Sequence, residues 1–226
     1  MVDIKRKIKK LTNDFDLIYR PDKYKYILCS KEEIIIRNFL GSCPDPDYAK
    51  YSNQKTNAAK NLLEFIKSKE FKQQLKQEHG CVISQSAIKN EIKFAKNIPD
   101  SSLRRDVLKF YYKLAHASMR ESILIYRPKN MREKIFNEVL LHEYIHVLLE
   151  DNRIRIRSWK WNEGLVAYMF HLVLHNYRFE KKPRPIKNKM LNVYNQYAHK
   201  WSMLLDNVYD PKERKRIILN TIKKLK

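Results

Sequence analysis

The residues best suited to chemistry lie between positions 142 and 163. His142-Glu143-Tyr144-Ile145-His146 places two histidines four residues apart, with a glutamate directly after the first. Positions i and i+4 lie on the same face of a helix, so both imidazoles can bind one metal ion. A glutamate beside them is suited to remove a proton from a water molecule. The pattern predicts a metal site with His142 and His146 as ligands and with Glu143 beside it.

The residues around this motif favour a buried metal site. Apart from Tyr144 and the motif's own His and Glu residues, every residue of 139–149 is aliphatic. Such a segment predicts a helix that is buried on all sides. Histidine and glutamate are costly in a core unless they are paired, and a metal ion supplies a partner. The alternative is that backbone carbonyl groups satisfy the two histidines.

A catalytic zinc ion usually has three protein ligands, so a third is expected nearby. Glu163 stands near the start of the next expected helix, between Trp161 and an apolar run. Gly164 follows it and is expected to let this helix approach the histidine helix closely. The other interpretation of Glu163 is an ordinary first-turn glutamate that the helix dipole favours. His171 and His175 lie about two and three helical turns further on and are alternative third ligands.

The segment HEYIH followed by WNEGLVAY resembles the gluzincin metallopeptidases, and the compact layout resembles the minigluzincins. The resemblance covers about residues 120–226. It implies that His142, His146 and Glu163 bind one zinc ion and that Glu143 is the general base of peptide hydrolysis. It also implies that the strand SILIY, residues 122–126, is an edge strand that aligns an extended peptide substrate.

Two features depart from the larger gluzincins. Sixteen residues separate His146 from Glu163, which predicts a short connecting loop. Thermolysin-like members have an aspartate four residues after the glutamate ligand, where this chain has Ala167, so Asp151 or a backbone carbonyl is expected to orient the first histidine. The donor that would stabilise an oxyanion stays open among six side chains: Tyr168, His171, His175, Tyr194, Tyr197 and His199.

The elements that must position this site are expected to be mostly helical, since three glycines in 226 residues are few for a fold rich in hairpins. The predicted fold class is mainly α (α+β). It has a minigluzincin-like core over 120–226 with a short strand or small sheet, and a mostly helical N-terminal region over 1–119. Helices are expected over 32–40, 57–77, 86–96, 101–117, 130–150, 161–177, 188–208 and 211–226, and strands over 24–29, 81–84 and 122–126.

The role of residues 1–119 stays open. One hypothesis is latency, in which Cys43 or the pair Asp45 and Asp47 reaches the zinc and blocks the cleft. The other is a helical region that binds substrate or adds stability.

The net charge of +22 is divided evenly, +11 in residues 1–120 and +11 in 121–226. It fits either a solvated lysine-rich surface or an affinity for nucleic acid. The alternative to a zinc peptidase acting on a protein or peptide is therefore a basic nucleic-acid-associated protein with a metallopeptidase-like zinc site. A peptidase that cleaves nucleic-acid-bound proteins would combine the two.

The cysteines, the basic N-terminal segment and the length of the apolar stretches indicate the cellular compartment. Three cysteines without a CxxC pair argue against a disulfide framework and against a zinc ribbon. The basic start has no apolar segment after it, which argues against a signal peptide. The apolar stretches 139–149 and 165–174 are too short to span a bilayer. A cytoplasmic protein without a membrane span is expected.

Overall fold

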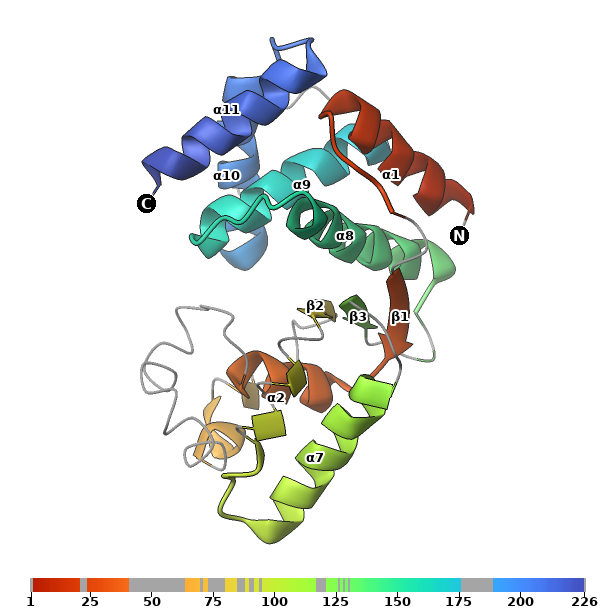
Figure 1. The fold of residues 1–226 in the computed structure, drawn as a ribbon, viewed down its shortest axis with the longest axis vertical. Helices are drawn as coiled ribbons and strands as arrows, with labels where there is room; N and C mark the ends of the chain where they lie inside the picture. Colours follow the sequence, from red (N-terminus) through yellow and green to blue (C-terminus); the bar gives the residue numbers. More distant parts are fainter. Residues whose placement is uncertain are drawn as a thin grey trace. The chain divides into compact units, whose positions relative to one another are not determined.

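The computed structural model is mainly α, which confirms the predicted predominance of helices (Figure 1). It describes thirteen stretches of the chain: residues 2–20, 24–40, 64–69, 71–72, 80–84, 88–89, 92–93, 95–116, 121–125, 127, 129, 131–175 and 189–225. Cys43, Asp45 and Asp47, on which the latency hypothesis depends, lie outside these residues. Among the described residues, no helix has both the length and the apolar character that crossing a membrane requires.

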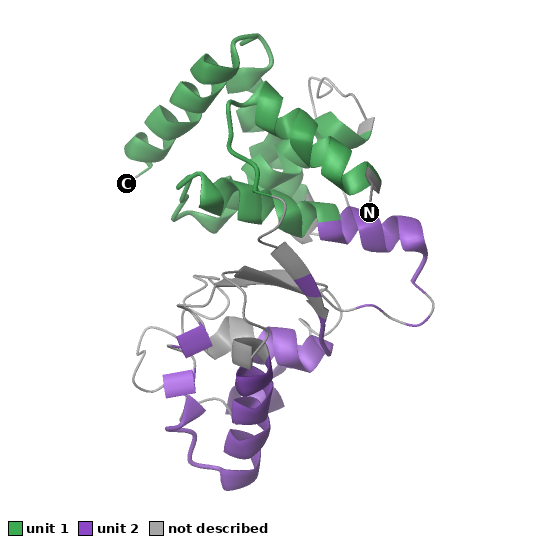
Figure 2. Ribbon diagram, turned by 45° about the vertical axis from the view of Figure 1, so that its right-hand side comes forward, with its two compact units in different colours: residues 1–21, 141–226 green, residues 22–140 purple. Residues whose placement is uncertain are grey.

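The chain divides into two compact units, which Figure 2 colours separately. Unit 1 comprises residues 1–21 and 141–226, and unit 2 comprises residues 22–140. The boundary falls within helix α8 (Glu133–Asp151), so the histidine motif belongs to unit 1. The predicted functional division at residue 119 is a different boundary and stays a prediction.

Unit 2 contains a three-stranded sheet and the helices α2 (Lys31–Leu40) and α7 (Ser101–His116). The strand order is β1 (Tyr24–Leu28), β3 (Glu121–Ile125), β2 (Gly80–Ser84). β3 pairs in parallel with β1 and antiparallel with β2. The prediction that this segment is an edge strand is therefore wrong.

Local sequence signals explain where the helices of unit 2 begin. At α2 the Ser30 hydroxyl accepts from the Glu33 amide at 3.1 Å, while the Glu33 carboxylate accepts from the Ser30 amide at 2.7 Å. This reciprocal pair is a capping box. At α7 the Asp100 carboxylate accepts from the Leu103 amide at 2.7 Å. Asp100 therefore caps α7, because a carboxylate is a strong capping acceptor.

Unit 1 is built from α1 (Val2–Asp14), the larger part of α8, α9 (Trp159–His175), α10 (Lys189–Leu205) and α11 (Pro211–Lys224). α9 packs along α10, and α1 also contacts α9. On α1, apolar residues recur at helical spacing, and Ile4, Ile8 and Leu11 are buried together with Phe15, which follows the helix. The Phe15 ring meets Tyr168 of α9 edge-on, with 6.3 Å between centroids.

A tight turn returns the chain from α8 to α9. The Ile154 amide donates to Leu149 and the Arg153 amide to Glu150, both at 2.9 Å, and Arg153 has a positive φ of 58°. These bonds form a Schellman motif, with arginine in the position that glycine usually occupies. The expected short connection is confirmed, and residues 153–157 form a loop rather than a strand.

Candidate metal centre

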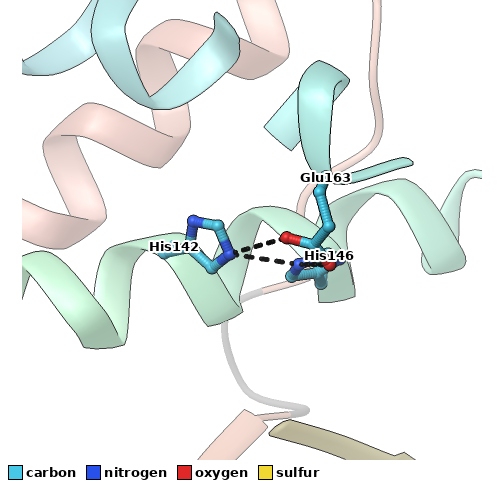
Figure 3. A group of neighbouring side chains, drawn as sticks. All are labelled: His142, His146 and Glu163. Carbon is cyan, nitrogen blue, oxygen red and sulfur yellow. Dashed lines mark hydrogen bonds and ion pairs between the residues drawn. The ribbon is translucent and has the colours of Figure 1, made fainter. Parts of the chain in front are cut away.

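The two histidines of the site lie on a helix with apolar side chains on all sides. Six aliphatic residues of α8 are at most 2% exposed: Leu140, Leu141, Ile145, Val147, Leu148 and Leu149. This confirms the predicted burial of residues 139–149. His142 and His146, one turn apart, point toward the start of α9 (Figure 3).

Glu163 approaches the two histidines from the first turns of α9 (Figure 3). Its Oε2 lies 3.3 Å from Nε2 of His142, and its Oε1 lies 3.3 Å from Nε2 of His146. The two Nε2 atoms are also 3.3 Å apart. The structure therefore brings together the three residues that the sequence singled out as ligands.

These three separations fit a shared metal ion. A tetrahedral zinc ion with bonds of about 2.0–2.1 Å holds its ligand atoms about 3.3–3.4 Å from one another. Across the described residues, this is the group of histidine, cysteine and acidic side chains whose ligand atoms are close enough to hold an ion. His171 is described and does not belong to the group, and the side chain of His175 lies outside the described residues.

The charge state of Glu163 also suits a ligand. Burial by itself would raise the pKa of this carboxyl, but the charge of His146 and the hydrogen bonds from both imidazoles hold the pKa well below its usual range. In the absence of a metal the carboxylate is thus deprotonated and paired with the two imidazoles, which must be neutral when they bind a metal ion.

The group is partly open to solvent. The side chains of His142, His146 and Glu163 keep 24%, 16% and 19% of their surface exposed. Structural zinc sites are usually closed by four protein ligands, whereas a catalytic site needs a position for water. Glu143, the next residue after His142, is 7% exposed and has a polar partner.

Two neighbours contact the imidazole rings from α9. The side-chain amide of Asn162 lies 3.5 Å from Nδ1 of His146. The Phe170 ring lies edge-on to His142, with 6.1 Å between centroids. Neither contact was predicted from the sequence, although Asn162 stands directly before Glu163. Asp151 makes no hydrogen bond to either ring within the described part of the chain, and its buried Oδ2 has no partner there, so the structure gives no support to its expected orienting role.

The structure excludes one of the six candidate donors for an oxyanion, Tyr168, and shows the surroundings of three others. The Tyr168 hydroxyl is buried and donates to Asp206 at 2.8 Å, so it is not available to a substrate. Tyr194 packs edge-on against Trp159 with 6.2 Å between centroids, and Tyr197 packs against Trp161 at 5.3 Å. Nδ1 of His199 is buried with no hydrogen-bond partner among the described residues.

Gly164 proves to serve a different contact from the one expected. A Cβ atom added there would lie 2.3 Å from Cβ and 2.8 Å from the carbonyl carbon of Tyr197, which belongs to α10. Consecutive helical residues point about 100° apart, so Glu163 can face α8 while Gly164 faces α10. The expectation that Gly164 permits close approach to the histidine helix is therefore corrected.

The fold and the site together define a mainly α chain with a His-His-Glu group that could hold a metal ion. The chain matches no protein-family model, no curated protein and no solved structure. The likeness to gluzincins therefore rests on the motif and its geometry.

Proposed function

We propose that this protein is a zinc-dependent metallopeptidase of the gluzincin type, with a minigluzincin-like core that hydrolyses peptide bonds in a protein or peptide substrate. The observation that carries the proposal is the cluster of His142, His146 and Glu163. The two Nε2 atoms lie 3.3 Å apart, and each has a different carboxylate oxygen of Glu163 at 3.3 Å. Two imidazoles and one carboxylate in a partly exposed group match the donor set of hydrolytic zinc sites.

The chain's own residues would divide the work as follows. His142, His146 and Glu163 hold the ion, and Asn162 orients the His146 ring from its far side. Glu143 accepts a proton from the attacking water and passes it to the leaving amine. A bound zinc ion would contribute acidification of that water and polarisation of the scissile carbonyl.

The substitution Glu143→Gln tests this proposal. It should keep the fold and one equivalent of zinc while peptide hydrolysis falls by about 10²–10⁴-fold, the usual contribution of a general base. Cleavage of a fluorogenic peptide mixture, measured together with the zinc content of both proteins, checks this. Equal turnover by the wild type and the variant would contradict the proposed mechanism.

A second candidate function has its own observation. α1 carries five lysine or arginine residues and two aspartates, and α11 carries six and one glutamate. The two helices are joined where Arg214 donates to the Asp14 carbonyl at 3.3 Å and Lys215 to the Asp16 carbonyl at 2.7 Å. Both belong to unit 1, the unit that holds the metal centre. A basic surface of this kind fits nucleic acid, so a peptidase that acts on nucleic-acid-bound proteins is the form this candidate takes.

A further inference from the structure

The position of Glu163 depends on whatever holds the start of α9. His142 and His146 share one helix, so their spacing is fixed by helix geometry alone. Glu163 lies on a different helix, beyond the loop that follows Asp151. Its carboxylate can reach both imidazoles only if the first turns of α9 are held in place.

Aromatic contacts with α10 hold those first turns. The Trp161 ring meets Tyr197 and Trp201 edge-on, with 5.3 Å between centroids in both pairs. The indole Nε1 of Trp201, a fully buried residue, donates to the backbone carbonyl of Trp161 at 2.9 Å. The ammonium group of Lys200 lies 4.1 Å from the centroid of the Tyr197 ring and 5.5 Å from that of the Trp161 ring. We call Trp161, Tyr197 and Trp201 the aromatic clamp.

The backbone on the other side of Glu163 is held by the same helix. Gly164 is in such close contact with Tyr197 that no Cβ atom fits between them. Glu163 therefore stands between two positions, 161 and 164, that are both fastened to α10. Its own side chain is left to face α8.

We propose that the aromatic clamp is the positioning device for Glu163 and presets the carboxylate at ligand distance from both histidines. The proposal rests on the metal site of the proposed function. Holding a ligand in its bound geometry removes the ordering cost of binding, so the clamp raises metal affinity without touching the metal. A cluster that served packing alone would contribute to stability and leave metal affinity unchanged.

Three variants of the full chain separate these roles. Trp161→Leu removes the ring at the centre of the clamp, and Trp201→Phe removes the Nε1 donor while keeping an aromatic ring. Tyr168→Phe is the matched control. Tyr168 lies on α9, five residues beyond Glu163, and the substitution removes its buried hydrogen bond to Asp206. Zn2+ affinity is measured by competition with a chelator, Co2+ coordination by its visible absorption spectrum, and stability by urea unfolding.

Trp161→Leu should lower zinc affinity by about 10- to 100-fold, the range typical of residues that support a ligand. It should also change the Co2+ spectrum. Trp201→Phe should shift both readouts in the same direction by less. Tyr168→Phe should lower stability while its zinc affinity stays within about twofold of the wild type.

Two results would overturn the clamp. If Trp161→Leu and Trp201→Phe lose stability but bind Zn2+ and Co2+ as the wild type does, the cluster is packing only. If Trp161→Leu does not fold, the comparison of Trp201→Phe with Tyr168→Phe decides by the same criterion. If the wild-type chain binds no Zn2+, the proposed metal site is wrong, and the proposed role of the clamp is wrong with it.

Discussion

Asn162 lies outside the ligand group but contacts the ring of His146, one of the proposed ligands. Nδ2 of Asn162 lies 3.5 Å from Nδ1 of His146. When Nε2 of His146 binds a metal, Nδ1 carries the ring proton, and the Asn162 amide presents its oxygen to that proton once it is turned by 180°. Asn162→Ala should therefore lower zinc affinity by about 10-fold or more, while Asn162→Asp keeps an acceptor and should retain most of it. A chelator-competition assay on both variants measures this. Wild-type affinity in Asn162→Ala would show that the contact has no orienting role.

At this scale, what sequence predicts depends on how local the contact is. The convergence of His142 and His146 follows from a four-residue spacing on one helix, so the motif alone suffices. Glu163 was assigned from its place after the motif and from the gluzincin resemblance, and the structure brings it to both rings. The place of Asn162 near the site could have been predicted, because it directly precedes Glu163 in the sequence. The packing of Phe170 against His142 carried none, because it depends on how two helices face each other.

The contact between α9 and α10 is sensitive to a single substitution at Gly164. Gly164→Ala improves helix propensity by about 1 kcal/mol. The new methyl group would, however, meet the backbone and Cβ of Tyr197, which cannot move away as a flexible side chain could. We expect a net loss of stability of about 1–3 kcal/mol from overpacking, measured by urea unfolding. A variant as stable as the wild type would show that α10 can shift at no cost.

Most of the helices that the structure describes were predictable, and the exceptions have physical causes. The helices expected over 57–77 and 86–96 lie mostly outside the described residues and stay predictions. α8 and α9 follow from apolar patterning, although α9 begins two residues earlier than expected. α1 was missed because its lysines were read as a charged start, yet Ile4, Ile8, Leu11 and Phe15 recur at helical spacing and are buried. The pairing of β3 with strands on both sides could not be predicted, because β1 and β2 are far from it in sequence.

For the molecule as a whole, the charge of +22 is the property that most needs a test. If α11 contributes to a nucleic-acid surface, changing the exposed residues Lys212, Lys223 and Lys224 to glutamine should weaken DNA binding and flatten its salt dependence. Each lost phosphate contact should reduce the slope of log affinity against log salt by about 0.9. Fluorescence anisotropy at several salt concentrations measures both.

A matched triple variant provides the control for this experiment. Lys93, Lys96 and Lys109 are exposed lysines of unit 2, and changing them to glutamine removes the same charge. Equal weakening by the two triple variants would show that charge acts diffusely over the surface. No binding by the wild type at low salt would leave a lysine-rich solvated surface as the explanation of the charge.

A zinc titration decides whether Glu163 completes a zinc site with His142 and His146. The wild type should bind one Zn2+ per chain. Glu163→Ala should lower the affinity by more than about 100-fold, since even supporting residues contribute 10- to 100-fold. His171→Ala, on the same helix but outside the group, should bind as the wild type does. Tight stoichiometric binding by Glu163→Ala, together with loss of binding in His171→Ala, would show that His171 and not Glu163 is the third ligand.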